Sequence, residues 1–421
     1  MKRVLLLTQY YLPENGAAQV RLAAMTTWLN RNDVDVEVVC PFPNYPQGQL
    51  RPEDRGKIYE KSAEVRWSKE HVIHRFWLFT AMGKGFARLL SYITFCVISF
   101  FSLSKVQKPD LVLVNSGPLF LALPGIFIAW WFKVPCHLIV ADLWPRSMEH
   151  IGGSFAGKIF LTLMKWLERW AYRHADGITA VTEGIKQTLL TEEKIPDQKV
   201  FFLPNGVDLT LFEHAKIDVN DVFAELKLSR DQFLFIYPGN LGNAHALETI
   251  LEVANHLQKE ARNYHFLFIG GGSEKPKLIR MREKLGLKNV TFLDSMPMEK
   301  LVRYIQAADC GLIHMKNSDL ANETRPAKMF PLMAASLPIL FCGFGEGQKL
   351  IDHQSELFCS PEDVPGILQK IKSLPDATKM LEYGHINRQI VERDFSVDSL
   401  VETWWKHLMV RDSIRANDGM T

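Results

Sequence analysis

The charged residues with the strongest claim to chemistry stand together in one short segment. Glu323, Arg325 and Lys328 precede an apolar stretch that predicts a helix, and Pro326 suits a first helical turn. Cationic side chains beside a helix N-terminus favour an anion. We therefore expect Arg325 and Lys328 to bind a diphosphate, and Glu323 to hydrogen-bond a sugar hydroxyl. The alternative is that Glu323 and Arg325 pair with each other on a surface loop.

Glycine-rich loops follow two predicted strands in the second half of the chain. They are Tyr237-Pro-Gly-Asn-Leu-Gly-Asn243 and Gly270-Gly-Gly-Ser273. The carboxyl ends of neighbouring parallel strands meet at one edge of a sheet. The two loops together therefore predict a platform of nucleotide size, although either loop alone is also typical of a plain turn.

Two residues of the first half, Gly16 and Asp142, occupy comparable positions. Gly16 follows the first predicted strand and opens a helix, whose unpaired N–H groups favour a phosphate. Its loop lacks the glycine pattern of a nicotinamide site. Asp142 follows the strand that ends at Val140, at the edge where open α/β sheets bind ligands. The alternatives are a plain turn glycine at position 16 and a turn cap at position 142.

The elements that must position these residues are short β-rich apolar runs that alternate with helical patterns. The runs are Val4–Leu7, Val34–Val39, Leu111–Val114, His137–Val140, Gly177–Val181 and Val200–Leu203 in the first half, and Phe233–Tyr237, Tyr264–Ile269, Val290–Phe292, Cys310–His314 and Pro338–Phe341 in the second. Such alternation predicts an α/β protein with two parallel sheets. Two domains fit a chain of 421 residues, and the turn cluster Leu203–Asp208 separates them. A packing helix is expected over Val397–Met409, with a frayed tail from Arg411.

The overall composition excludes some classes of function. The chain has 49 Lys and Arg against 47 Asp and Glu, a net charge of +2, so a dedicated nucleic-acid binder is not expected. Its six cysteines are scattered without a metal-ligand spacing, which indicates buried free thiols and no structural zinc. The N-terminus is typical of a strand rather than of a signal peptide, so we expect a cytoplasmic chain.

One uncharged stretch of the first half, Leu89–Leu103, has 15 residues, fewer than the about 20 that a membrane-spanning helix needs. Aromatic and basic residues accompany it, namely Lys84, Arg88, Phe100, Trp130 and Trp131. This combination is typical of a helix that lies in a membrane interface, with basic residues on anionic head groups. The alternative is a buried helix packed against the first sheet.

Several of these motifs resemble those of the retaining GT-B glycosyltransferases of family 4. They are the turn Leu203-Pro-Asn-Gly-Val-Asp208, the two glycine loops and the segment Glu323–Ala335. Ala175-Asp-Gly-Ile-Thr-Ala-Val-Thr182, the Gly16 loop and Asp142-Leu-Trp-Pro145 are similar to the bacterial O-antigen and capsule branch that includes N-acetyl-L-fucosaminyl transferases. The resemblance covers nearly the whole chain.

This resemblance implies a GT-B fold of two Rossmann-like domains, with parallel sheets facing across a cleft. The first domain, 1–205, would bind the acceptor, and the second, 206–395, would bind the donor nucleotide. A closing helix and tail, 396–421, would cross back to the first domain.

The activity implied is that of a metal-independent hexosyltransferase-type enzyme without a cofactor. It would move an N-acetylated deoxyhexose or hexosamine from a UDP-sugar to a polyprenyl-diphosphate-linked saccharide, at the inner face of the cytoplasmic membrane. The leaving diphosphate would be stabilised by positive charge and N–H groups. Asp142, Glu323 and Lys328 would be catalytic. The donor contacts would be Gly16, Gly239, Asn240, Gly242, Asn243, Gly271, Gly272, Ser273, Met296, Arg325 and Lys328, and the acceptor and membrane contacts Lys84, Arg88, Phe100, Trp130 and Trp131.

Two positions depart from the family pattern. Pro331 stands where relatives carry a second glutamate that holds the nucleotide ribose, and Asn243 stands where close relatives tend to carry a basic residue. Arg325 and Lys328 would then carry more of the diphosphate charge. These departures leave open a catalytically degenerate scaffold. A non-hydrolysing UDP-sugar 2-epimerase, which shares the two-domain architecture, is the other alternative.

Overall fold

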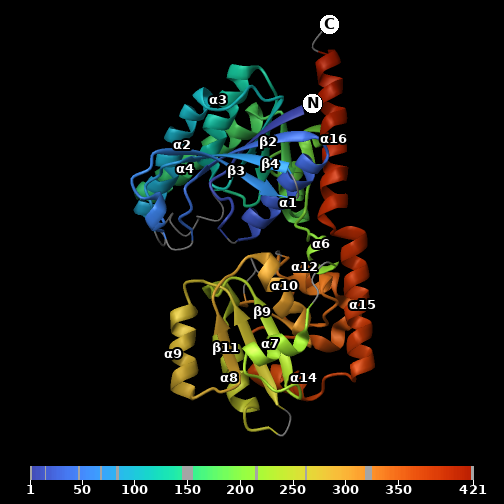
Figure 1. Cartoon of the computed structure of the whole chain (residues 1–421). Helices are drawn as coiled ribbons and strands as arrows, with labels where there is room; N and C mark the ends of the chain where they lie inside the picture. Colours follow the sequence, from blue (N-terminus) through green and yellow to red (C-terminus); the bar gives the residue numbers. More distant parts are fainter. Residues whose placement is uncertain are drawn as a thin grey trace. The chain divides into compact units, whose positions relative to one another are not determined.

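The computed structural model describes residues 2–14, 16–45, 48–66, 69–81, 85–144, 155–213, 217–260, 263–317 and 325–418. The chain forms two compact units (Figure 1). Unit 1 comprises Met1–Asn205 together with Asp398–Thr421, and unit 2 comprises Gly206–Val397. The chain therefore passes from one unit to the other twice, once after Asn205 and once after Val397.

Unit 1 contains a sheet of eight strands in the order β3-β4-β2-β1-β5-β6-β7-β8. Its strands are β1 (Lys2–Leu7), β2 (Val34–Pro41), β3 (Tyr59–Arg66), β4 (Lys69–Phe76), β5 (Leu111–Asn115), β6 (Cys136–Val140), β7 (Gly177–Ala180) and β8 (Val200–Phe202). Neighbouring strands are parallel except for the antiparallel pair of β3 and β4. Strands β5 and β6 are buried at every position, as expected for central parallel strands that helices cover.

The β3–β4 hairpin is the part of this sheet that the apolar runs do not predict. Both strands carry many charged residues, for example Glu60, Lys61 and Glu64 in β3. Strand β3 lies at the edge of the sheet, where a polar sequence is tolerated and discourages pairing with other chains. A search for apolar runs therefore passes over this hairpin.

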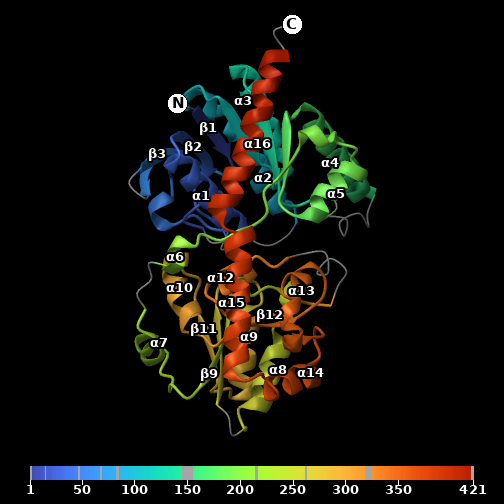
Figure 2. The same ribbon diagram turned by 90° about the vertical axis from the view of Figure 1, so that its right-hand side faces the viewer.

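The helices of unit 1 are α1 (Ala17–Arg31), α2 (Phe86–Ser99), α3 (Ala122–Phe132), α4 (Phe155–His174), α5 (Glu183–Thr191) and α16 (Val397–Asp418). Helix α16 comes from the end of the chain and lies along unit 1 (Figure 2). Its Trp404 is buried, and the Trp404 Nε1 donates to Thr179 Oγ1 of β7 at 3.0 Å. The expectation of a frayed tail from Arg411 was wrong, because no glycine or proline interrupts the helix before Gly419.

Unit 2 contains a sheet of six parallel strands in the order β11-β10-β9-β12-β13-β14. Its strands are β9 (Phe233–Pro238), β10 (Tyr264–Ile269), β11 (Val290–Leu293), β12 (Cys310–His314), β13 (Ile339–Cys342) and β14 (Phe358–Cys359). Its helices are α6 (Thr210–Glu213), α7 (Val219–Glu225), α8 (Glu248–Leu257), α9 (Lys275–Leu285), α10 (Met298–Ala307), α12 (Met329–Ala334), α13 (Glu346–Leu350), α14 (Val364–Lys372) and α15 (Ala377–Asp394). The predicted strands are confirmed in both units, and so is the two-sheet α/β fold.

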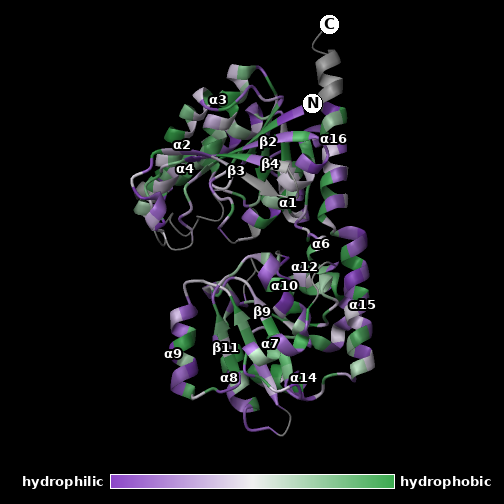
Figure 3. Cartoon of the chain, viewed as in Figure 1, coloured by the Kyte–Doolittle hydropathy of each residue, from purple (hydrophilic) through white to green (hydrophobic). Residues whose placement is uncertain are grey.

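The core of unit 2 lies on both faces of its sheet. Alternate residues of β9 belong to different clusters: Leu234 and Ile236 pack with α7, α10 and α12, whereas Phe235 and Tyr237 pack with α8, α9 and α14. Figure 3 shows these strands as largely hydrophobic. Two buried faces hold the sheet rigid, so the loops at its carboxyl edge start from fixed positions.

Candidate functional site

The two glycine loops of unit 2 are joined to each other by backbone hydrogen bonds. Leu241 N donates to Gly271 O at 2.8 Å, and Glu274 N donates to Leu241 O at 3.0 Å. The structure therefore brings together the loop after β9 and the loop after β10, as the sequence predicts. Asn240, Asn243 and Ser273 are exposed along this platform.

Glycine is required where these loops touch. A Cβ on Gly270 would lie 1.8 Å from the carbonyl oxygen of Gly239, and a Cβ on Gly272 would lie 2.4 Å from that of Leu241. Gly239 and Gly272 also have φ angles of +127° and +152°, which side chains rarely allow. The close contact of the two loops thus depends on these glycines.

Lys328 reaches this platform from the turn before α12. Its Nζ donates to Tyr237 Oη at 2.6 Å and lies 3.4 Å from Nε2 of His245. A Cβ on Gly239 would lie 3.4 Å from Lys328 Cε, so the lysine stem runs beside the first glycine loop. Desolvation lowers the pKa of the Lys328 ammonium to about 7. The expected diphosphate-binding lysine is thus placed at the glycine loops.

His245 and His314 were not among the residues expected from the sequence. His314 Nδ1 donates to the backbone oxygen of His245 at 2.7 Å, while His314 Nε2 accepts from Glu362 N at 3.1 Å. These two bonds fix the neutral tautomer of His314 and hold the short turn η6 (Asn243–His245) against β12. Desolvation, followed by the charge of Lys328, lowers the pKa of His245 to about 3.

Arg325 is engaged within unit 2. Its Nη2 lies 3.5 Å from Glu346 Oε2, and its guanidinium lies 5.3 Å from the ring centroid of Phe395. Glu346 therefore balances part of the positive charge of Arg325, which we expected to bind a diphosphate. Glu323 lies outside the described residues. Met296 is partly buried and packs against the core cluster that contains α10 and α12.

In unit 1, Asp142 lies at the carboxyl end of β6, as predicted, and keeps access to solvent. Desolvation raises the pKa of its carboxyl, and the charge of Arg21 opposes that rise. Arg21 of α1 is buried, and its Nη1 donates to Asn205 Oδ1 at 2.7 Å. Gly16 is the extended residue that begins α1, and no side chain caps this helix.

Arg88 differs most from its expected place. Its Nε donates to Tyr92 Oη at 3.1 Å and its Nη2 donates to Tyr10 Oη, and the guanidinium also lies 5.9 Å from the ring centroid of Tyr45. The ring of Tyr92 in turn contacts Trp144, with centroids 5.8 Å apart. A cation held by three tyrosines near the ends of β1, β2 and β6 is not free to meet a lipid head group. Lys84 lies outside the described residues.

Large apolar side chains are exposed on three helices of unit 1. They are Phe86, Ile93, Val97 and Phe101 on α2 and the turn η2 (Phe100–Ser104), Phe127, Trp130 and Trp131 on α3, and Ile159, Leu163 and Trp166 on α4. Ring contacts join Phe127 to Phe100, Trp130 and Trp131 at centroid distances of 5.4, 5.8 and 6.4 Å. We call this set of residues the aromatic face.

Helix α2 and the turn η2 follow each other without a break, so the helical segment that begins at Phe86 is longer than the uncharged run Leu89–Leu103 suggested. In the described part of the chain, Phe86–Ser104 is the one helix long and apolar enough to cross a membrane, with 19 residues and a mean hydropathy of 1.7. Only 28% of it is buried within the protein. Core helices of soluble proteins also pass this test, so the length alone does not make it a spanning segment.

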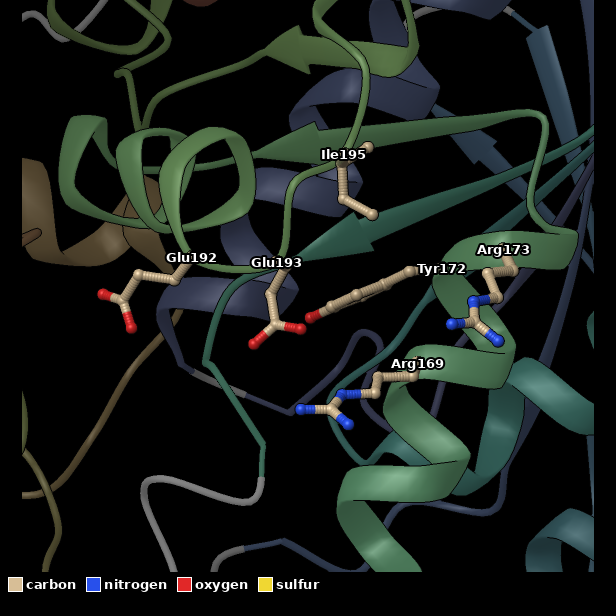
Figure 4. A pocket seen from close by; sticks show the side chains of 6 residues that line it. All are labelled: Arg169, Tyr172, Arg173, Glu192, Glu193 and Ile195. Atoms are coloured by element: carbon tan, nitrogen blue, oxygen red, sulfur yellow. The ribbon is translucent and has the colours of Figure 1, made fainter.

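A cavity of about 210 Å³ lies elsewhere on unit 1, between the last turn of α4 and the segment after α5 (Figure 4). Arg169, Tyr172 and Arg173 line one side, and Glu192, Glu193 and Ile195 line the other. Because α4 ends just before β7 begins, this cavity lies at the amino ends of the strands, away from Asp142. Within the described ranges, no three His, Cys, Asp or Glu side chains converge as metal ligands would. All six cysteines are buried free thiols, as predicted.

Two family models match successive parts of the chain. Residues 16–206 match the model described as glycosyl transferase 4-like domain, and residues 218–383 match glycosyl transferases group 1. The first match ends next to the point where unit 1 gives way to unit 2.

Two curated relatives are similar to this chain over most of their length. WcaI of Escherichia coli K12, named as a colanic acid biosynthesis glycosyl transferase, is 26% identical over 381 residues, 89% of each chain. The 2-deoxystreptamine glucosyltransferase of Streptomyces kanamyceticus is 24% identical over 75% of this chain and 80% of its own.

Solved structures share the fold at low identity. HepE of Anabaena in complex with UDP has a TM-score of 0.65 and 14% identity, covering 97% of this chain and 100% of its own. The sucrose-phosphate synthase of Thermosynechococcus elongatus has a TM-score of 0.67 and 16% identity, covering 99% and 100%.

Proposed function

Because the chain is a glycosyltransferase of the GT-B fold, in which a glycosyl transferase 4-like domain precedes a group 1 domain, we propose that it transfers a sugar from a UDP-sugar with retention of configuration. The sugar proposed is an N-acetylated deoxyhexose or hexosamine. The proposed acceptor is a lipid-diphosphate-linked saccharide of O-antigen, capsule or exopolysaccharide synthesis. The name of WcaI supports a role in an exopolysaccharide, and the UDP complex of HepE supports a UDP-linked donor.

The observation that carries this proposal is the position of Lys328 at the joined glycine loops. A departing diphosphate develops negative charge, and a cationic side chain held in place with nearby N–H groups stabilises it. Lys328 supplies that cation beside Gly239, from a turn that the apolar helix α12 fixes against the core. In this scheme no divalent metal is needed, because lysine and backbone groups take the charge of the leaving group.

Asp142 is proposed to orient the acceptor hydroxyl in unit 1. Its carboxyl lies at the carboxyl end of β6 and has solvent access. The proton of the hydroxyl would pass to the leaving phosphate as the new glycosidic bond forms. Arg21 supports this role, because its charge favours the ionised form of the neighbouring Asp142.

The aromatic face is proposed to hold the enzyme on the inner surface of the cytoplasmic membrane. Trp130 and Trp131 are 69% and 61% exposed, and tryptophan favours the boundary between lipid and water. Basic residues accompany the face, including Lys133 after α3 and Lys158 and Lys165 on α4. Their charges match anionic head groups.

The test is release of UDP by the purified protein from candidate UDP-sugars, with and without a polyprenyl-diphosphate-linked saccharide. We expect release only when the acceptor is present, and loss of release in Lys328→Ala. Lys277→Ala is the matched control, since Lys277 is an exposed lysine of α9 that pairs with Glu248. Formation of an epimer from the UDP-sugar alone would contradict the proposal in favour of an isomerase. Binding of UDP without turnover of any donor would favour a scaffold.

A further inference from the structure

The surroundings of Lys328 contain no compensating negative charge among the residues that the structure describes. Its Nζ contacts the hydroxyl of Tyr237 and the ring of His245, which lies 3.5 Å away at Nδ1 and 3.4 Å away at Nε2. Its ammonium also lies 4.2 Å from the ring centroid of Tyr237. Among the residues with described positions, only neutral groups therefore surround the Lys328 amine.

The other ionisable groups around this cluster act on His314 rather than on Lys328. His314 on β12 feels the carboxylates of Glu248 on α8 and of Glu362 after β14. His314 remains neutral because its Nδ1 donates to a backbone oxygen, whereas its Nε2 accepts from a backbone N–H. Tyr237 on β9 is buried, which raises the pKa of its hydroxyl and keeps it protonated.

We propose that Lys328 and His245 form a diphosphate-binding pair that is uncharged in the empty site and takes up one proton from solvent when a nucleoside diphosphate binds. The inference rests on the proposed function for the position of the diphosphate, and it adds His245 as a second residue of that site. In the empty site, the amine donates to Tyr237 Oη and lies beside the imidazole of His245, while Tyr237 Oη donates to Asn240 O. In the occupied site, the protonated amine of Lys328 donates to phosphate oxygens, and the neutral imidazole of His245 accepts a hydrogen bond from that amine.

Physical chemistry gives the direction of this coupling. Burial disfavours the charged form of an amine, and desolvation brings the pKa of Lys328 to about 7. A bound diphosphate brings negative charge next to the amine and raises its pKa again. His245 does not compete for the proton, since its own pKa is lowered to about 3. Relatives tend to carry a cation at the position of Asn243. Here the neutral, hydrogen-bonding ring of His245 lies two residues further along the chain.

The experiment is calorimetric titration of the full chain with UDP at pH 8, in buffers of different ionisation enthalpy. The second phosphate pKa is about 6, so UDP itself is fully ionised and any proton uptake belongs to the protein. We expect uptake of about one proton, and an affinity that falls up to about tenfold per pH unit above pH 7. At pH 5.5 the protein should take up no proton, because Lys328 is then charged before binding, and the remaining proton exchange is release from the partly protonated phosphate of UDP.

Variants separate the two residues. Lys328→Arg should bind UDP without proton uptake, because arginine keeps its charge. His245→Phe should bind UDP about 10- to 100-fold more weakly, the range for a lost hydrogen bond to a charged group. His245→Asn, which keeps a donor and an acceptor, should recover part of that loss.

Two results would overturn the inference while leaving the proposed function intact. One is binding of UDP at pH 8 without proton uptake. The other is equal uptake in Lys328→Arg and in the unaltered protein. Lysine-selective carbon NMR gives a second measurement on the unaltered chain, in which the Lys328 signal should titrate near pH 7 without UDP and well above it with UDP. Failure to bind UDP at any pH would instead overturn the proposed function, and this inference with it.

Discussion

At the scale of single residues, each unit contains a cationic side chain that is poorly suited to a protein without a ligand. Lys328 is surrounded by neutral partners, and Arg21 is buried with Nε and Nη2 unpartnered among the described residues. A buried cation whose donors lack partners costs stability unless a ligand supplies them. Lys328 therefore favours an anionic ligand in unit 2, and Arg21, whose charge Asp142 partly balances, keeps two donors for a polar ligand group in unit 1.

The lowered pKa of Lys328 predicts a definite dependence of stability on pH. Between pH 7 and about 10.4, the unfolded chain binds a proton at Lys328 that the folded chain does not, so this residue makes stability rise with pH by up to about 1.4 kcal/mol per unit. Lys328→Met should therefore be more stable than the unaltered protein at pH 7, by a margin that shrinks towards pH 10. Urea unfolding of both proteins from pH 6 to 10 measures this margin. A margin that stays constant with pH would show that Lys328 keeps an ordinary pKa. In the control, Lys277→Met, the difference in free energy of unfolding should not decrease in this way as the pH rises.

The contact between the glycine loops predicts a sensitive position at Gly270. An added Cβ would meet the Gly239 carbonyl oxygen at 1.8 Å, and backbone atoms cannot move aside as a flexible side chain would. We expect Gly270→Ala to lower the free energy of unfolding by about 1–3 kcal/mol and to weaken UDP binding. Chemical denaturation and calorimetry test both effects. Gly184→Ala on α5, where an added Cβ would meet only Thr182 Oγ1 at an ordinary 4.0 Å, should be neutral or slightly stabilising. An equal loss there would remove the argument from backbone contact.

At the scale of elements, helix α16 is part of the unit 1 core. Trp404 is 1% exposed and donates to Thr179 of β7. Trp404→Ala should cost about 3–5 kcal/mol, the range for a large aromatic removed from a core. The thermal unfolding of the variant measures the loss. Lys406→Ala is the control on the same helix, where an exposed lysine pairs with Glu402, and there we expect a change below about 1 kcal/mol.

The aromatic face predicts binding to lipid surfaces. Trp130→Ser combined with Trp131→Ser should strongly reduce sedimentation with vesicles of anionic lipid, and leave the unfolding temperature nearly unchanged because both side chains are mostly exposed. Leu381→Ser, an exposed apolar residue of α15 in unit 2, provides the matched control. Unchanged sedimentation of the double variant would assign the face to another partner.

The sequence predicted the elements in which apolar strands alternate clearly with helical patterns, and it missed the elements that lack this alternation. Apolar runs predicted the central strands because parallel strands are buried on both faces. The β3–β4 hairpin was missed, because charged residues dominate an edge hairpin. The position of Lys328 followed from the segment before α12, whereas His245 was missed because its approach to Lys328 depends on the path of η6 after β9. Arg88 was expected to be an acceptor or membrane contact, whereas its long side chain turns back to Tyr10 and Tyr92, which no linear pattern indicates.

At the scale of the whole molecule, unit 2 is one continuous stretch of chain, whereas unit 1 is assembled from both ends. The two connecting segments lie side by side within unit 2, where Val207 N donates to Phe395 O at 3.0 Å and Val397 N donates to Val207 O at 3.1 Å. This arrangement brings the start of α16 back next to the end of the first 205 residues. Two covalent links, rather than one, connect the units.

The discontinuity of unit 1 also orders events during synthesis on the ribosome, where domains form as their residues emerge. The side chain that completes the unit 1 core, Trp404, emerges only after all of unit 2 has been made. A nascent chain or a product of premature termination thus contains a complete unit 2 while unit 1 is still incomplete. The core of unit 1 therefore closes only after Trp404 of α16 has been translated.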